Sequence, residues 1–491
     1  MNILLIQPPI TIAKGEAFGV TPPLGLAYLA SVAEKNGHHV RIIDTIAEGY
    51  NLRCYKNGQI RIGLKADDIR KEIEKFHPDL VGITCPFSLM DNEMRFVASL
   101  VKNVDRNIPV VVGGAHPSSM PEHVIRDPNI DFLVVGEGEG TFLDLVKRID
   151  EGASCLDLKG AWIKVNGKIR KNAKREFIMA LDSIPFPAWH LLPMEKYMEI
   201  GQAHGSQKRK RFASIITSRG CPGTCVFCSI HSVWGYEWRA RTPENVVSEI
   251  ERLVTAYDIR EIHFEDDNLT LSKQRIAKIC DLIIERGLDI SWTTPNGVAV
   301  QTIELYLLEK MRKSGCYQLS FGIESGDPYV LRKIIHKPLS LDKVKKVVIW
   351  SKKLGIWTHG FFVIGFPGES AHSIRRTTDF AKETDLDSAN FFIATPYPGT
   401  PLYSLASSKG SLKEGFDLAR LRTMDATINT EYFEAKELIE LQKKAYLEFM
   451  RYRVQREIIY GDFLIRFFKI RSLDDVAFLI RKIRRFIRIF R

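Results

Sequence analysis

The sequence lacks any uncharged apolar run of membrane-spanning length, which takes about 20 residues. Its first residues, Met1–Pro9, have no basic lead-in, and no small-residue cleavage site follows them, so no signal peptide is predicted. Cysteine is scarce, with eight among 491 residues, and only three of the eight stand close together. This spacing is typical of a metal site in a reducing compartment and not of a disulfide framework. We therefore expect a cytoplasmic protein.

An excess of positive charge is missing from most of the chain, although the net charge of the whole is +11. The segment 451–491 holds twelve Lys and Arg against four Asp and Glu, which accounts for +8 of that charge. The body is therefore close to neutral, and no nucleic-acid partner is expected. Hydrophobic residues make up 45% of the chain, as in a folded globular protein, and 491 residues suffice for two or three domains.

The first 150 residues alternate short apolar runs with stretches of helix length. The runs are Ile3–Ile6, Val40–Ile43, Asp79–Thr84, Pro109–Gly113 and Asp131–Val135. Buried strands separated by helices predict a parallel, doubly wound, Rossmann-like sheet over residues 1–150. Ligands of such sheets bind beyond the carboxyl ends of the strands. The residues expected there are Thr84, Gly113, Gly114, His116, Gly136 and Glu137.

A second alternation of strands and helices starts at residue 211, after a connector over residues 151–210 that contains a hairpin turn at Asn166-Gly167. Its strands are expected at Ser214–Thr217, Glu261–Phe264, Ser291–Thr294, Gln318–Gly322, Gly360–Ile364 and Asn390–Ala394. Six βα units over residues 211–400 predict a partial (β/α)6 barrel with its active site at the carboxyl ends of the strands. Residues 401–491 are expected to be helical. The predicted fold class is therefore α/β.

A cysteine loop directly follows the first barrel strand, with Cys221, Cys225 and Cys228 inside eight residues. Three thiolates can hold three irons of a 4Fe–4S cluster, which normally takes four cysteines, so one iron stays open to another ligand. A zinc site is the alternative, because His231 could complete a Cys3His set. Structural zinc sites more often take ligands from two knuckles, and the sequence contains no second one.

The Cys-x3-Cys-x2-Cys loop, with Phe227 before its last cysteine, resembles that of the radical S-adenosylmethionine (SAM) superfamily. Other segments resemble the branch with an N-terminal cobalamin-binding domain, which includes the class B radical SAM methyltransferases. At the barrel strand ends these segments are Phe264–Thr270, Phe321–Gly326, Ile364–Glu369 and Thr395–Leu402. In the first 150 residues they are Thr21–Leu26, His39–Asp44, Gly113–Pro117 and Gly136–Phe142.

The resemblance implies three cofactors: a 4Fe–4S cluster on Cys221, Cys225 and Cys228, SAM on the open iron, and cobalamin on the first domain. The SAM-binding residues that it implies are Phe227, Glu324, Ser325, Gly365, Pro367 and Gly368. Asp266 and Asp267 would position substrate or the SAM amino group, or cap the next helix. The six strand-end residues of the first domain would contact cobalamin.

One departure from other cobalamin proteins concerns the cobalt ligand. No Asp-x-His-x-x-Gly segment is present to supply a histidine to the cobalt. Either the first domain binds cobalamin without that ligand, or it serves only as a scaffold. His116 is correspondingly either a cobalt ligand or a loop histidine satisfied by hydrogen bonds.

The implied activity is cleavage of SAM to a 5′-deoxyadenosyl radical, which takes a hydrogen atom from an unactivated carbon. With cobalamin bound, the expected outcome is methylation of that carbon in a small-molecule or lipid substrate. Ring closure or another carbon-skeleton reaction is the alternative, and a non-catalytic cobalamin- or metal-binding regulator is a third interpretation. An electron donor such as flavodoxin or ferredoxin is the expected protein partner. Substrate-directed catalytic residues are not identifiable.

The C-terminal end predicts a basic amphipathic helix that begins at Ser472. Apolar residues recur at helical spacing from Leu473 to Phe490, and Lys and Arg fill the other face. Such a helix either packs its apolar face on the barrel or lies on an anionic membrane surface. In the second case the protein would be peripheral to the inner face of the membrane.

Overall fold

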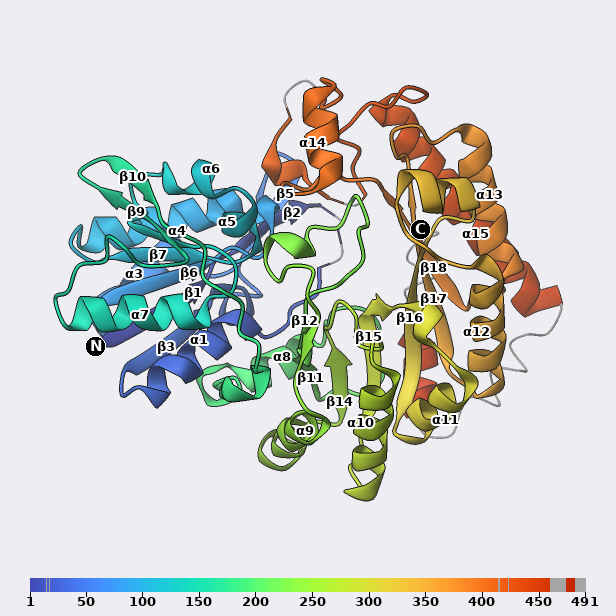
Figure 1. Cartoon of the computed structure of the whole chain (residues 1–491), viewed down its shortest axis with the longest axis horizontal. Coiled ribbons are helices and arrows are strands. Elements are labelled where there is room, and N and C mark those ends of the chain that lie inside the picture. Colours follow the sequence, from blue (N-terminus) through green and yellow to red (C-terminus); the bar gives the residue numbers. More distant parts are fainter. Residues whose placement is uncertain (15, 17, 414–415, 423, 460–473, 482–491) are drawn as a thin grey trace.

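Two mainly parallel sheets flanked by helices lie side by side and form the two halves of the molecule (Figure 1). This computed structural model describes residues 1–14, 16, 18–413, 416–422, 424–459 and 474–481. The expected α/β class, with a Rossmann-like first half and a barrel-like second half, is confirmed. None of the described helices has the length and apolar character that a membrane span needs.

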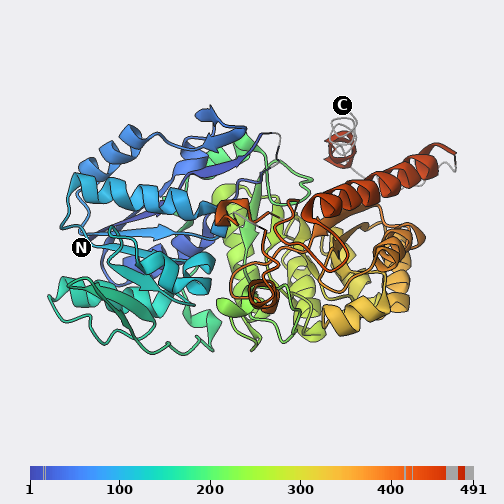
Figure 2. The ribbon, with the colours of Figure 1, turned by 90° about the horizontal axis from the view of Figure 1, so that it is seen from above.

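The first sheet contains five parallel strands, in the order β8-β7-β6-β1-β3. Their bounds are β1 Asn2–Gln7, β3 His39–Asp44, β6 Leu80–Thr84, β7 Val110–Gly113 and β8 Phe132–Val134. The helices that follow these strands in the chain are α1 Leu24–Lys35, α2 Thr45–Glu48, α3 Ala66–Phe76, α4 Asp91–Val104, α5 Ala115–Ser119, α6 Pro121–Ile125 and α7 Glu139–Asp150. The strands are almost continuously buried, because helices pack against them (Figure 2). This burial explains why apolar runs marked them in the sequence.

Two features of the first half differ from the expectation. The hairpin of β9 (Ala161–Val165) and β10 (Lys168–Lys171), assigned to the connector, pairs with β8 and extends the first sheet. A separate three-stranded antiparallel sheet, absent from the prediction, joins β2 (Ile10–Ala13), β5 (Gln59–Ile62) and β4 (Arg53–Lys56). Its strands are only four residues long, and each includes at least one polar residue, so no long apolar run marks them.

The second half has six parallel strands in chain order, β11-β14-β15-β16-β17-β18. Their bounds are Phe212–Ile215, Glu261–Phe264, Ser291–Val298, Cys316–Glu324, Trp357–Ile364 and Ser388–Ile393. The outer helices are α9 Pro243–Tyr257, α10 Lys273–Glu285, α11 Leu305–Lys313, α12 Leu341–Lys353, α13 Ala371–Glu383 and α15 Ala435–Ile459, with α8 Met194–Ile200 before the barrel and α14 Pro401–Ser408 after it. Strands β11 and β18 end the sheet without pairing with each other, so the barrel is partial and open along one side.

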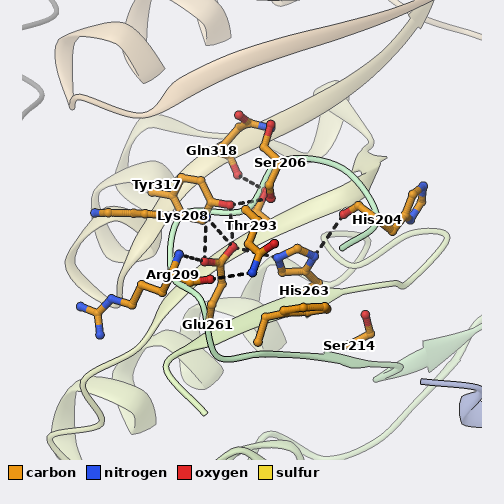
Figure 3. Close-up of polar contacts among 12 residues, drawn as sticks. His204, Ser206, Lys208, Arg209, Ser214, Glu261, His263, Thr293, Tyr317 and Gln318 are labelled. Carbon is orange, nitrogen blue, oxygen red and sulfur yellow. Dashed lines mark hydrogen bonds and ion pairs between the residues drawn. The ribbon is translucent and has the colours of Figure 1, made fainter. Parts of the chain in front are cut away.

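The amino end of the barrel is closed by a buried polar network around Glu261, the first residue of β14 (Figure 3). Its carboxylate accepts hydrogen bonds from the main-chain N–H of Lys208 at 2.8 Å and the hydroxyl of Tyr317 at 2.7 Å. His263 Nε2 lies 2.8 Å from the same carboxylate, and its Nδ1 lies 3.1 Å from the main-chain oxygen of His204. Both ring nitrogens of His263 thus face oxygen atoms, and the imidazole links Glu261 to the segment before the barrel.

A helical segment over residues 474–481 packs against the same end of the barrel. Phe478 is 2% exposed, and its ring centroid lies 5.3 Å from that of Tyr317 and 5.7 Å from that of Trp357. Asp475 forms an ion pair with Lys208 at 2.6 Å. These contacts favour packing on the barrel for this part of the predicted amphipathic helix. Residues 472–473 and 482–491 of that prediction lie outside the described residues.

We expect Glu261→Ala to destabilise the barrel by about 3–5 kcal/mol, because the change leaves the buried N–H of Lys208 and the hydroxyl of Tyr317 without their acceptor. Denaturation of the full chain by guanidinium, followed by circular dichroism, measures this loss. Glu285→Ala, at an exposed position of α10, is the matched control and should change stability by less than about 0.5 kcal/mol. Equal denaturation midpoints for Glu261→Ala and the wild type would contradict the anchoring role of Glu261.

Candidate functional site

Loops from the carboxyl ends of both sheets meet between the two halves. A Cβ atom at Gly399, after β18, would lie 2.4 Å from Ser232 Oγ and 3.3 Å from Ser119 Cβ. A Cβ atom at Gly136, after β8, would lie 3.6 Å from the main-chain oxygen of Val233. Since Ser232 and Val233 follow the cysteine loop, that loop lies next to the predicted ligand edge of the first sheet.

Four buried charges hold this contact in place. Arg219, in the short strand β12 (Ser218–Arg219), pairs with Glu137 at 3.2 Å and with Glu139. Arg239, in β13 (Arg239–Ala240), pairs with Glu137 at 2.6 Å, and all four side chains are buried. Burial alone raises the pKa of Glu139, but the charge of Arg219 and its hydrogen bond outweigh this and hold that pKa below its usual value. Glu139 is therefore an ionised partner of Arg219, and Glu137 is hydrogen-bonded to both arginines.

The cysteine loop is shaped by backbone contacts at its two ends. Gly220 has φ +84°, and a Cβ atom there would lie 2.1 Å from the main-chain oxygen of Glu237, so only glycine fits. The N–H of Val226 donates to Ile335 O at 3.1 Å, and the N–H of Leu402 donates to Val226 O at 2.9 Å. The loop is thus fixed to segments beyond β16 and β18.

The three thiols of this loop are free and partly buried. The backbone of Gly223 lies between two of them, since a Cβ atom there would be 3.5 Å from Cys221 Sγ and 3.9 Å from Cys225 Sγ. Burial raises the pKa of Cys228 to about 12 and also raises that of Cys225. Thiolates at this position therefore need the positive charge of bound metal ions.

The spacing of the thiols fits a cluster better than a single ion. Tetrahedral zinc with Zn–S bonds of about 2.3 Å brings its sulfur ligands to roughly 3.8 Å from one another. Among the described residues, only Asp91, His116 and His123 bring three potential ligand atoms within 4.8 Å of one another. His231, the expected fourth zinc ligand, instead directs Nε2 to the main-chain oxygen of Cys221 at 3.1 Å. The three thiols are therefore spaced more widely than the ligands of one zinc ion. A 4Fe–4S cubane binds each cysteine sulfur to a different iron and so accommodates this spacing.

Three consecutive residues that follow β14, Asp266, Asp267 and Asn268, lie near the cysteine loop and differ in their contacts. The buried carboxylate of Asp266 accepts hydrogen bonds from the N–H of Thr217 at 3.1 Å and from its hydroxyl at 2.8 Å. Asp267 reaches solvent, yet the surrounding protein and the charge of Asp266 raise its pKa to about 7. Asn268 Nδ2 lies 3.7 Å from Cys221 Sγ. Asp266 therefore has a structural role, and of the two acidic residues Asp267 remains available to a ligand.

Glu324 ends β16 in a left-handed backbone conformation, with φ +67°. Lys337 Nζ donates to its Oε1 at 2.8 Å, and a Cβ atom at Gly322 would lie 2.8 Å from that oxygen and 2.9 Å from Nζ. Glycine at position 322 therefore makes room for the pair. Burial alone lowers the pKa of Lys337, but the charge of Glu324 outweighs it and raises that pKa. Glu324 is thus held in place through its Oε1 atom.

The other predicted SAM-binding residues lie around the same strand ends. Phe227 packs against Phe366 at 5.8 Å between ring centroids, in an apolar wall beside the cysteine loop. A Cβ atom at Gly365 would lie 2.8 Å from Leu438 Cδ2, and the N–H of Gly368, next to Pro367, donates to Glu431. Ser325 uses its hydroxyl to bind Thr377 Oγ1 at 2.9 Å. Packing against Leu438 thus explains why glycine stands at position 365. The hydroxyl of Ser325 is used in a hydrogen bond within the protein.

The six predicted cobalamin contacts share one edge of the first sheet. Thr84, Gly113, Gly114 and Gly136 are half-buried there, at the ends of β6, β7 and β8. Glu137 is instead occupied by its two arginine partners and by the N–H of Ile178 at 2.7 Å.

His116 is also occupied, and it is 1% exposed. Its Nδ1 lies 3.0 Å from Ser88 Oγ, and its Nε2 lies 3.1 Å from Asp91 Oδ1. Asp91 in turn binds Arg95 and His123. These contacts favour the hydrogen-bonded loop histidine over the cobalt ligand.

Sequence reasoning missed four contributors to the site: Arg219, Arg239, Lys337 and Asn268. Arg219 and Lys337 belong to no motif, and their partners Glu137 and Glu324 lie 82 and 13 residues away in the chain. Asn268 stood inside a segment recognised by resemblance, but nothing in its spacing indicated a contact with Cys221. Only the tertiary structure brings these pairs together.

Comparison with known families agrees with this site. The B12 binding domain model matches residues 10–146, and the Radical SAM superfamily model matches residues 215–381. An uncharacterized methyltransferase of Pyrococcus horikoshii is 40% identical over 454 residues, which cover 91% of this chain and 92% of the relative. The cytidylyl-2-hydroxyethylphosphonate methyltransferase of Streptomyces wedmorensis is 35% identical over 476 residues, covering 90% and 89%.

More distant relatives extend the comparison. The anaerobic magnesium-protoporphyrin IX monomethyl ester cyclase of Rubrivivax gelatinosus is 29% identical over 455 residues, covering 91% of this chain and 77% of the cyclase. The solved structure of the radical SAM methyltransferase TsrM from Kitasatospora setae has the same fold. Its TM-score is 0.69 at 18% identity, with 84% of this chain and 76% of that one covered.

Fold, site and relatives together define a radical SAM enzyme with a cobalamin-binding domain. The chain belongs to the cobalamin-dependent radical SAM methyltransferase family. Its cofactors are a 4Fe–4S cluster, SAM and cobalamin, as the sequence predicted. The protein is an enzyme, so the non-catalytic regulator is set aside.

We expect Cys221→Ala, Cys225→Ala and Cys228→Ala each to lose most of the iron and sulfide bound after anaerobic reconstitution, because each removes one of three cluster ligands. Iron and sulfide analysis with visible absorption spectra measures the loss. Cys54→Ala, at an exposed cysteine of β4, is the control and should bind as much iron as the wild type. Full iron content in any of the three loop variants would contradict the assignment of that cysteine.

Proposed function

We propose that this enzyme methylates an unactivated carbon of a small, oxygen-rich substrate bound between its two halves. The observation that carries the proposal is the contact between the cysteine loop and the glycine-rich edge of the first sheet, fixed by Arg219, Arg239, Glu137 and Glu139. The methyl donor and the site of hydrogen abstraction must both reach one carbon atom, and this contact brings their predicted binding sites together.

When bound, the cluster and SAM supply the 5′-deoxyadenosyl radical that removes a hydrogen atom, and cobalamin supplies the methyl group. The protein binds and orients the cofactors and the substrate, and it excludes water from them. We propose Cys221, Cys225 and Cys228 as the cluster ligands. Glu324, held by Lys337, is proposed to accept hydrogen bonds from the SAM ribose. The apolar wall of Phe227 and Phe366 would cover the adenine side.

The cobalamin-binding unit is proposed to include the hairpin of β9 and β10, which continues its sheet, and so to extend beyond residue 150 to about residue 171. The barrel is proposed to span residues 211–400. The glycine-rich edge with Thr84, Gly113, Gly114 and Gly136 would face the corrin, whereas His116 and Glu137 would support that edge through their hydrogen bonds.

The substrate is proposed from the relatives. The Streptomyces wedmorensis enzyme is named for cytidylyl-2-hydroxyethylphosphonate, and 35% identity along nine-tenths of both chains makes this compound the first to test. A pair of polar groups at the carboxyl end of β14 suits such a substrate: His204 Nδ1 lies 3.0 Å from Glu265 Oε2, and the histidine side chain is 53% exposed. Cyclisation is the second candidate, favoured by the resemblance to the Rubrivivax gelatinosus cyclase.

With reductant, SAM and cytidylyl-2-hydroxyethylphosphonate, we expect the reconstituted enzyme to form methylated product, 5′-deoxyadenosine and S-adenosylhomocysteine in equal amounts. Two molecules of SAM are consumed, because one yields the radical and the other replaces the methyl group that cobalamin has given up. Mass spectrometry and liquid chromatography measure all three products, and Cys225→Ala is the inactive control. 5′-Deoxyadenosine without S-adenosylhomocysteine would contradict methyl transfer and favour cyclisation.

Two further partners are proposed. Reduction of the cluster requires an electron donor, and flavodoxin or ferredoxin is proposed for a cytoplasmic enzyme. Peripheral contact with the membrane through Lys482, Arg484, Arg485 and Arg488 is proposed from the charge of the tail, with a lipid substrate as its corollary. Phe478, on the apolar side of this segment, is packed against the barrel, so any such contact would rest on charge.

Changing these four basic residues to Glu should abolish co-sedimentation with phosphatidylserine vesicles, because charge attraction to an anionic surface is lost. Wild-type binding should weaken with added salt for the same reason. Phosphatidylcholine vesicles are the control. If the wild-type chain does not co-sediment with phosphatidylserine vesicles at low salt, the result contradicts both the membrane contact and the lipid substrate.

A further inference from the structure

The side-chain amide of Asn268 contacts one of the three cysteines of the loop. Its Nδ2 donates a hydrogen bond to Cys221 Sγ at 3.7 Å, and the residue is 7% exposed. Within the described ranges, no other side chain donates a hydrogen bond to the sulfur of Cys221, Cys225 or Cys228. The contact is therefore specific to one of the three proposed ligands.

The surroundings of Asn268 hold the amide in this position. Its main-chain oxygen accepts a hydrogen bond from Trp238 Nε1 at 3.0 Å, and the next residue, Leu269, is buried. Asn268 Oδ1 is buried without a hydrogen-bond partner, so no competing contact turns the amide away from the sulfur. A metal-bound thiolate only accepts hydrogen bonds, and the NH2 end of the amide is therefore the end that fits against it.

A hydrogen bond to a cluster sulfur has a known direction of effect. Reduction adds negative charge to the cluster and its thiolates, and a donor stabilises that charge, so the reduction potential rises. We propose that Asn268 is a positioning residue that raises the reduction potential of the cluster through its hydrogen bond to Cys221. The inference rests on the proposed cluster ligation and goes beyond it, because it assigns a role to a residue outside the cysteine loop.

Charged groups near the other two cysteines must be kept constant in a test. Lys337 and Glu324 lie near Cys225, and Asp267 lies near Cys228. Each of them also acts on the potential through its charge. Asn268→Leu is close in size and changes no charge, so it isolates the hydrogen bond. Asn268→Asp keeps the shape, removes the donor and adds negative charge if ionised.

The experiment is a redox titration of the full chain, reconstituted with cluster and cobalamin and without SAM or substrate. Low-temperature electron paramagnetic resonance follows the reduced cluster. We expect the potential to fall in Asn268→Leu and to fall further in Asn268→Asp. Asn172→Leu is the matched control, because Asn172 Nδ2 donates to Leu158 O at 3.1 Å in the first half of the molecule, and its potential should equal that of the wild type.

If both Asn268 variants bind the full amount of iron and their clusters have the reduction potential of the wild type, the proposal is overturned. If Asn268→Leu fails to retain its cluster, Asn268→Asp decides alone by the same criterion. Because no substrate is added, failure to find a methylated product leaves this result unaffected. A wild-type chain that binds no cluster would overturn both the ligation and the tuning.

Discussion

The pairing of Arg219 and Arg239 with Glu137 and Glu139 is the contact on which the arrangement of the two halves depends. Arg219 stands two residues before Cys221, and Glu137 directly follows Gly136 at the edge of the first sheet. The cysteine loop and that edge therefore cannot move independently of each other. Chemistry that needs two cofactors within reach of one carbon atom requires this kind of fixed geometry.

The same charges make the interface costly to rearrange. Removing one partner of a buried ion pair leaves an uncompensated charge and costs about 3–5 kcal/mol, a large share of the roughly 5–15 kcal/mol that stabilises a typical protein. Two arginines meet two carboxylates, so the group is neutral as a whole. Arg219 also lies over the ring of Trp234 at 4.5 Å, and Arg239 lies over that of Phe177 at 4.6 Å. Planar guanidinium groups suit such stacked and paired positions.

The sequence was informative where local chemistry decides the structure. Apolar runs located the parallel strands of both sheets, because a strand buried on both faces is mostly apolar, and the cysteine spacing located the loop. The same reasoning left the β9–β10 hairpin in the connector, since an Asn-Gly turn predicts a hairpin but not the sheet that it joins. It assigned Glu137 to cobalamin from its place after a strand, whereas its arginine partners come from the barrel half. Partners so distant in the chain leave no periodic signal.

The segment Asp266-Asp267-Asn268 shows how one strand end can serve a structure and its chemistry together. Asp266 is turned inward and fixes Thr217, so that the chain enters the cysteine loop at a set position. Asp267 reaches solvent, where a carboxylate can meet a cationic ligand group. Asn268 is turned toward Cys221. An ionised acid at position 268 would repel the thiolates and an apolar residue would offer them no hydrogen bond, whereas the amide of Asn268 lies against the sulfur and stabilises added charge through its N–H.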